Sequence, residues 1–335
     1  MEKSLKVCFL ILFLSVSALA GSGDAFFQPG NQIPLHEAGD ADDNGVVDEN
    51  DILAVRKQLL GLSSAPGDPD SNGDGVIDVA DVISIHLYIF NPPKIVVQPA
   101  DGVSLVFRKI PAGAFSMGSS EPGWATSFEQ PVHNVTIGYI FYMGQTEVTK
   151  KQWNAVMGID PPSAETENQP VEHVSWNECQ TFIDNLNALS DYTFRLPTEA
   201  EWEYACRAST SARFSFGDSD CEANACTDCN LSNYAWWCGN NSPLGVKNVA
   251  QKLPNAFGLY DMHGNVFEWC RDYWHFDYSG APDDGGAWMT PESQQRVLRG
   301  GYWDASPWEC SSSSRAFNYP DGKDKQSGLR LILER

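Results

Sequence analysis

The stretch Arg195-Leu-Pro-Thr198-Glu-Ala-Glu201-Trp202-Glu-Tyr-Ala-Cys206-Arg207 predicts a short helix with a defined start. Thr198 and Glu201 form a capping box, in which each side chain accepts a hydrogen bond from the backbone N–H of the other residue. Trp202 and Cys206 lie one helical turn apart, so we expect both side chains to face the core. This segment therefore anchors a folded domain in the second half of the chain.

Two more capping boxes, Thr149 with Gln152 and Ser175 with Glu178, predict helices upstream of this segment. The second box begins an amphipathic helix, whose apolar face contains Cys179, Phe182, Ile183, Leu186 and Leu189. Alternating apolar residues at 103, 105 and 107 predict a strand. After residue 208 the sequence is rich in Gly, Asn, Asp and aromatic residues, which favours loops and short strands. We therefore expect an α+β domain with much irregular backbone.

The length of 335 residues is enough for two domains or one large one. The 22 basic and 44 acidic side chains give a net charge of −22, which argues against nucleic acid or anionic lipid as partners. All 11 tryptophans lie between Trp124 and Trp308, so residues 101–335 are expected to form a separate compact unit. The Pro-containing segment 93–100 is predicted to be a stiff linker before it.

The N-terminus has the pattern of a secretory signal peptide, residues 1–20. Lys3 and Lys6 precede a short apolar run, and Ala18 and Ala20 supply the small residues before a cleavage site. The alternative is a buried N-terminal strand. We expect a secreted or cell-surface protein with no membrane insertion after cleavage, in a compartment where disulfides persist.

Two acidic stretches, spaced 30 residues apart, have the ligand spacing of EF-hand-type calcium loops. Oxygen-bearing side chains occupy loop positions 1, 3, 5, 9 and 12, and position 7 offers a backbone carbonyl. The predicted ligands are Asp40, Asp42, Asn44, Val46, Asp48 and Asp51 in the first loop, and Asp70, Asn72, Asp74, Val76, Asp78 and Asp81 in the second. Without a cation these carboxylates would repel one another, so calcium is an expected cofactor.

Residues 39–92, a duplicated loop followed by an apolar helix, resemble a type I dockerin, a small α-helical calcium-binding domain. The resemblance implies a cohesin-bearing scaffold or surface protein as partner. Loop positions 10 and 11, which read that partner in the family, are Glu49-Asn50 and Val79-Ala80 here. A calcium-stabilised spacer that binds no partner is the alternative.

Residues 101–335 resemble the sulfatase-modifying-factor family, whose founding member is the formylglycine-generating enzyme. The similarity rests on the Arg195 segment and on the motifs Gly258-Leu-Tyr-Asp261-Met-His-Gly264-Asn-Val-Phe-Glu268-Trp269, Arg299-Gly-Gly301 and Gly328-Leu-Arg330, in that order. The resemblance implies a variant of the C-type lectin fold. It also implies an oxidase that uses dioxygen and copper(I) to convert a cysteine of a sulfatase into an aldehyde.

In the family, two cysteines separated by four residues hold the copper ion shortly after the Arg-Gly-Gly motif. The corresponding positions here are Ala305 and Cys310, so one sulfur ligand is absent. Cys310 is the candidate catalytic residue, and a disulfide with Cys206 or Cys270 is its alternative role. Cys221, Cys226, Cys229 and Cys238 are predicted to form loop disulfides, with a zinc site as the alternative.

The resemblance also implies a second kind of calcium site within the large domain. Its ligands would be the carboxylates of Asp261 and Glu268 and the carbonyls of Gly264 and Val266, and hard oxygen ligands of this type suit calcium. Such an ion would hold a loop in place and take no part in chemistry.

Two functions remain open at this point. The missing cysteine favours an accessory module that binds a peptide or glycan in an aromatic cleft. The otherwise complete motifs favour the oxidase, acting on sulfatases in the breakdown of sulfated polysaccharide. An iron oxidase on the same fold would need clustered histidines, which the sequence does not offer, and no Ser-His-Asp grouping is readable.

Overall fold

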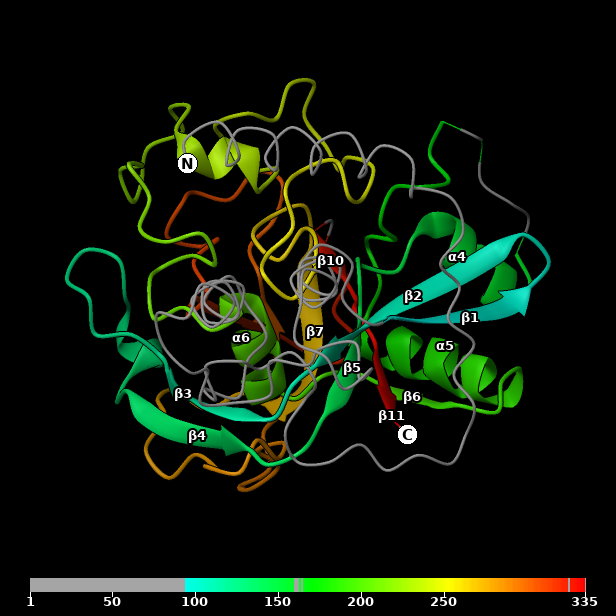
Figure 1. Ribbon diagram of the computed structural model, residues 1–335, viewed down its shortest axis with the longest axis horizontal. Helices are drawn as coiled ribbons and strands as arrows, with labels where there is room; N and C mark the ends of the chain where they lie inside the picture. Colours follow the sequence, from blue (N-terminus) through cyan, green and yellow to red (C-terminus); the bar gives the residue numbers. More distant parts are fainter. Residues whose placement is uncertain (1–93, 160–162, 164, 325, 335) are drawn as a thin grey trace, which may run out of the picture. The chain divides into compact units, whose positions relative to one another are not determined.

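The computed structural model describes residues 94–159, 163, 165–324 and 326–334. The predicted signal peptide and both predicted calcium loops lie outside these residues. A five-stranded antiparallel sheet has the order β1-β2-β5-β11-β6 (Figure 1). Its strands are β1 (Lys94–Ala100), β2 (Val103–Ile110), β5 (Phe141–Gly144), β11 (Ile332–Glu334) and β6 (Thr193–Arg195). The last described strand, β11, therefore lies between strands from the first half of the domain.

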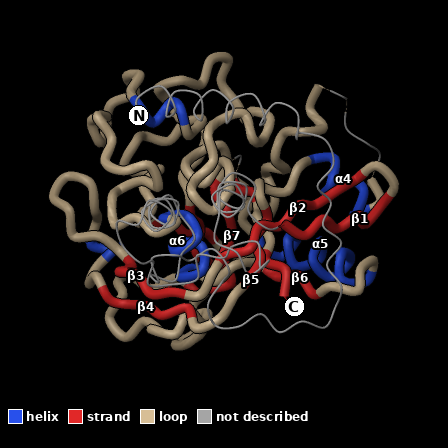
Figure 2. Tube along the Cα trace, viewed as in Figure 1, coloured by secondary structure: helices blue, strands red, loops and turns tan. Residues whose placement is uncertain are grey.

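A second sheet of four strands has the order β10-β7-β8-β9, and only its β10–β7 pair is parallel. Its strands are β7 (Phe267–Tyr273), β8 (Arg296–Arg299), β9 (Arg315–Asn318) and β10 (Ser327–Gly328). The hairpin-like pair β3 (Gly113–Met117) and β4 (His133–Ile137) forms a third, two-stranded sheet. Long stretches between residues 208 and 266 are loop, as Figure 2 shows, which agrees with the predicted irregular backbone.

The three predicted helices are present, and each begins with the predicted capping box. They are α4 (Lys150–Met157), α5 (Trp176–Ala188) and α6 (Glu199–Arg207), and two 3₁₀ turns, Ser127–Glu129 and Asn230–Asn233, accompany them. Leu189 was predicted to be on the buried face of α5, but this is wrong. The helix ends at Ala188, so Leu189 becomes its C-cap and is 53% exposed.

The segment 93–100 was predicted to be a linker, but residues 94–100 form the edge strand β1. Its backbone pairs with β2 from Lys94, opposite Arg108, to Ala100, opposite Val103. Val97 is buried against the same core as α4 and α5, and this burial supplies the apolar contact that a linker would lack. The folded domain therefore begins before residue 101.

Helix α6 lies in the core of the domain, because all nine of its residues are buried. Trp202 and Cys206 are fully buried, as predicted, and Trp202 donates its indole N–H to Glu268 Oε2 at 2.6 Å.

The three glutamates of α6 are also buried, and each forms an ion pair with at least one arginine. Glu201 accepts two hydrogen bonds from Arg195, at 2.6 and 2.7 Å. Glu203 accepts from Arg299 at 2.6 Å and from Arg207 at 2.9 Å. Glu199 accepts two hydrogen bonds from Arg315, at 2.6 and 2.9 Å.

Arg299, at the end of β8, connects this charged core to the loop that follows it. Its guanidinium is fully buried and donates to the carbonyls of Ser312 at 2.7 Å and Ser313 at 3.0 Å. The same group binds Glu203, so the position of residues 301–314 depends on α6. None of the helices in the described part of the chain is long and apolar enough to cross a membrane.

We predict that Arg299→Met lowers the free energy of unfolding by about 3–5 kcal/mol, because it leaves Glu203 buried with part of its ion pairing removed. Lys323→Met is the matched control: Lys323 binds Glu178 at 2.6 Å, but both side chains are exposed, so the loss should be below about 1 kcal/mol. Urea unfolding in calcium-containing buffer measures both. If both variants lost the same free energy of unfolding, the buried ion pairs of Arg299 would not be important for the stability of the core.

Candidate functional site

The loop after β8 places Cys310 inside the protein. Gly301 has a φ of 75°, and a Cβ at this position would lie 2.8 Å from Cys310 Sγ, so only glycine allows the approach. Glu309 Oε2 accepts hydrogen bonds from the backbone N–H of Ser306 at 2.9 Å and from its hydroxyl at 2.7 Å. The turn between the two family copper positions is therefore tightly fixed.

Cys310 is a free, fully buried cysteine, and so are Cys206 and Cys270. The predicted disulfide between Cys310 and one of these two residues is thus wrong: Cys206 instead makes long sulfur contacts, at 3.8 Å, with Met262 O and with the His263 ring. Burial raises the pKa of the Cys310 thiol well above its usual range. Because the thiolate is the reactive form, the metal-free Cys310 is a poor nucleophile.

Ala305 is also fully buried and belongs to the same apolar cluster as Cys310, together with Phe214, Leu231 and Trp237. The methyl group of Ala305 therefore occupies a dry environment where the family places a sulfur. Among the described residues, one group of three acidic or sulfur-bearing side chains lies close together, namely Asp220, Cys221 and Cys229, and the two cysteines of this group are bonded to each other. This group does not include Cys310.

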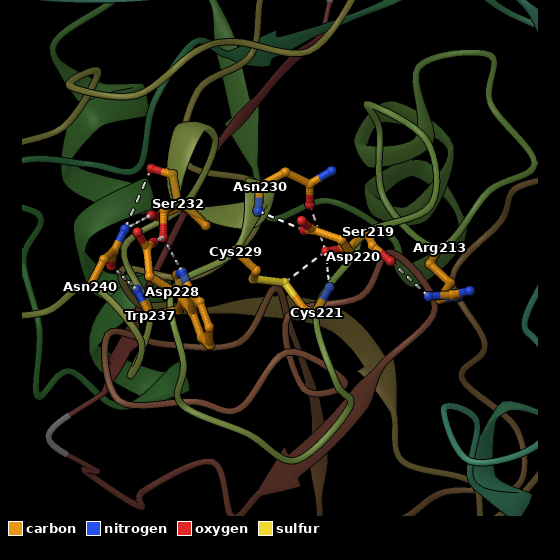
Figure 3. Close-up of a disulfide and its surroundings, with 11 residues drawn as sticks. Arg213, Ser219, Asp220, Cys221, Asp228, Cys229, Asn230, Ser232, Trp237 and Asn240 are labelled. Carbon is orange, nitrogen blue, oxygen red and sulfur yellow. Dashed lines mark hydrogen bonds between the residues drawn. A yellow bond between two sulfur atoms is a disulfide. The ribbon is translucent and has the colours of Figure 1, made fainter.

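A loop closed by two disulfides covers this segment. Cys221 is bonded to Cys229 (Figure 3). Cys226 is bonded to Cys238. Both bonds agree with the predicted loop disulfides, and they leave none of these four cysteines free to bind zinc. Near the first disulfide, Ser219 Oγ binds Asn230 Oδ1 at 2.7 Å, and Asp220 accepts from the Asn230 backbone at 2.8 Å (Figure 3). The backbone N–H of Cys238 donates to the Ala305 carbonyl at 3.1 Å, which ties the loop to the copper-position segment.

His263 fixes the backbone of Cys310 from the other side. Its Nε2 accepts the backbone N–H of Ser215 at 3.1 Å, so Nδ1 carries the proton and donates to the Cys310 carbonyl at 2.9 Å. Burial lowers the pKa of His263 to about 4. The imidazole is thus neutral with both nitrogens engaged, and it acts as a structural bridge rather than as a general base.

The predicted calcium ligands lie in a buried cluster of carboxylates. Glu268 is fully engaged, because Arg330 binds both of its oxygens at 2.7–2.9 Å and Trp202 donates to one of them. Asp261 accepts the Ala250 N–H at 2.7 Å through Oδ2, but its Oδ1 has no hydrogen-bond partner among the described residues. Gly264, the next predicted ligand, donates its N–H to Gly300 O and turns with a φ of 106°.

Glu147 is a further acid in this cluster that the sequence analysis did not identify. It is fully buried, its Oε1 also lacks a described partner, and burial together with the neighbouring Asp261 raises its pKa well above the usual range. Burial likewise raises the pKa of Asp261 to about 6. Three carboxylates thus face one arginine, Arg330, and two of their oxygens lack a described partner. In the described residues the three carboxylates do not come close enough together to surround one ion by themselves, so backbone carbonyls would have to complete a calcium site. In the sequence, Glu147 is marked only by its position two residues before the capping box at Thr149, which does not indicate a metal ligand.

Comparison with known proteins gives a consistent result. The model of the sulfatase-modifying factor enzyme 1-like domain matches residues 104–335. A chaperone protein LppX from Paenibacillus barcinonensis is 30% identical over 245 residues, 59% of this chain and 81% of that protein. The formylglycine-generating enzyme of Thermomonospora curvata is 30% identical over 193 residues, 54% of this chain and 61% of that enzyme.

Solved structures agree with this assignment. PvdO from Pseudomonas aeruginosa has a TM-score of 0.63 and 27% identity, covering 73% of this chain and all of that one. Treponema denticola variable protein 1 has a TM-score of 0.61 and 26% identity over the same shares. From the matched region, the shared motifs and the sheet-rich fold, this chain belongs to the sulfatase-modifying factor enzyme 1-like domain family.

Proposed function

We propose that this chain is an exported accessory protein whose family domain binds a ligand and does not oxidise cysteine. The observation that carries the proposal is the buried methyl group of Ala305 in the same apolar cluster as the single buried thiol of Cys310. Copper(I) prefers soft sulfur ligands, and one thiol cannot grip the ion between two sulfurs. The residues present do not fit the copper ion, so no oxidative step is assigned to this site.

The names of the relatives are compatible with more than one role for this domain. A relative matched over 81% of its length is named a chaperone protein, which supports a function in binding other molecules. The second candidate is the copper- and dioxygen-dependent oxidase that converts a sulfatase cysteine to formylglycine, in the breakdown of sulfated polysaccharide. It is favoured by the similarity to an enzyme named for that activity.

We predict that the wild-type protein binds no copper(I) stoichiometrically, whereas Ala305→Cys gains one tight site. The new sulfur would stand in the position that the family uses, next to Cys310. A competition titration against a copper(I) chelator measures binding, and Ala305→Ser is the matched control because it adds a hard oxygen in place of sulfur. Unfolding curves check that each variant folds, since enlarging a packed site costs about 1–3 kcal/mol.

The accessory role would be contradicted if the wild-type protein bound one copper(I) ion and Cys310→Ser bound none. That result would favour the oxidase.

Calcium is proposed to occupy the cluster of Asp261 and Glu147. We expect saturating calcium to raise the unfolding midpoint of the domain by roughly 5–10 °C, because a ligand at about 100 times its Kd adds about 2.7 kcal/mol. Tryptophan fluorescence reports this domain alone, since every tryptophan lies between residues 124 and 308. The calcium-dependent shift should vanish in Asp261→Ala and persist in Asp304→Ala, an exposed acid in the same domain. If calcium raised the unfolding midpoint of both variants by the same amount, calcium binding at Asp261 and Glu147 would be excluded.

The segment 39–92 is proposed to bind two calcium ions and to attach the protein to a cohesin on a scaffold or on the cell surface. Calorimetric titration of the full chain should lose two calcium sites when Asp40→Ala and Asp70→Ala are combined, because each removes the first ligand of its loop. Asp43→Ala, at a loop position that offers no ligand, should keep both sites. Unchanged stoichiometry in the double variant would refute the assignment.

A further inference from the structure

A hollow of about 660 Å³ lies where the start of α5 meets β7 and β8. Its volume falls within the range of about 300–1,000 Å³ that is typical of small-molecule sites. Its lining includes Trp176, Asn177, Tyr273, Glu292, Gln294 and Arg296. The hollow shares no residue with the segment from Ala305 to Cys310, so it is separate from the site that the family uses for copper.

Arg296 is the polar centre of this hollow. Its guanidinium lies between two aromatic rings, 4.1 Å from the Trp176 ring and 4.0 Å from the Tyr273 ring. The side chain is only 8% exposed, and Nη1 donates to the Arg271 carbonyl at 2.6 Å. Nε, however, has no hydrogen-bond partner among the described residues. That nitrogen is shielded from solvent, so a molecule in the hollow would meet only the atoms of Arg296 that line it.

The aromatic walls of the hollow are held rigidly. Trp176 donates its indole N–H to the Cys270 carbonyl at 2.9 Å, which fixes the plane of the ring. Tyr273 belongs to β7, and its hydroxyl is directed toward Glu292 Oε1 at 3.5 Å. Both rings are partly exposed, so they offer an ordered apolar surface at little cost in side-chain entropy.

The mixture of polar groups points to a ligand that both donates and accepts hydrogen bonds. Arg296 offers a donor, the exposed Glu292 offers an acceptor, and the amides of Asn177 and Gln294 offer both. A hydroxyl group satisfies any of these, and the C–H face of a sugar ring packs on an aromatic face, which carries negative partial charge. The net charge of −22 disfavours a polyanion.

We propose that this hollow binds a neutral oligosaccharide. The inference rests on the binding role proposed above and names its ligand class and its site. Arg296 and Glu292 would hold the sugar hydroxyls. Arg296 already covers one face of the Trp176 ring and one face of the Tyr273 ring, so the sugar would pack on the parts of these rings that remain exposed.

The test is a calorimetric titration of the full chain, in calcium, with neutral hexasaccharides of glucose, xylose, mannose and galactose, and with trigalacturonate as the acidic probe. At least one neutral probe should bind, and trigalacturonate should not. Glu292→Ala, at an exposed position that folding does not need, should weaken binding roughly tenfold, because it removes a charged acceptor. Arg296→Lys should weaken it by a similar factor, since lysine keeps the charge but lacks the planar fork.

The matched control is Arg213→Lys, because Arg213 also stacks on a tryptophan, Trp124, at 4.4 Å but lies outside the hollow. This variant should bind as the wild type does. The proposal is wrong if no neutral probe binds, if Glu292→Ala binds unchanged, or if trigalacturonate binds in preference. Copper(I) titration is independent of these results, so failure of the sugar site and failure of the accessory role can be told apart.

Discussion

The structure depends on guanidinium groups that neutralise the buried carboxylates of α6. An uncompensated charge in a protein interior is strongly unfavourable, so Glu199, Glu201 and Glu203 can be buried only because arginines from other elements reach them. Arg299 joins α6 to the loop that follows β8, since it binds Glu203 and the carbonyls of Ser312 and Ser313. The loop that contains the two copper positions is thus placed by ion pairs made far away in sequence.

This constraint explains how the domain can keep the architecture of its family with Ala305 at one of the two positions where the resemblance implies a sulfur ligand. The fold is stabilised by arginine–glutamate pairs, by His263 and by the disulfide-closed loop over Ala305, and none of these contacts needs a second thiol. Under the proposed accessory role, loss of one sulfur leaves this framework intact and removes the copper site. A surface elsewhere on the same framework, such as the hollow around Arg296, remains available for binding.

Local patterns predicted local structure well. The capping boxes at Thr149, Ser175 and Thr198 determined three helix starts, because both partners of each box lie within one turn. Contacts between distant segments could not be read from the sequence. The unpaired state of Cys310 depends on burial supplied by a separate loop, and Glu147 joins Asp261 only after β5 and the 261–268 loop come together. The strand at 94–100 was missed because its partner, β2, determines its conformation.

The central claim is that the single buried sulfur at Cys310 leaves the domain without oxidase chemistry. The most direct measurement incubates the wild-type protein with copper(I), dioxygen and a Cys-x-Pro-x-Arg peptide, and follows the peptide by mass spectrometry. The account predicts that the peptide cysteine is not converted to an aldehyde. Catalytic conversion to the aldehyde, abolished by Cys310→Ser, would contradict it.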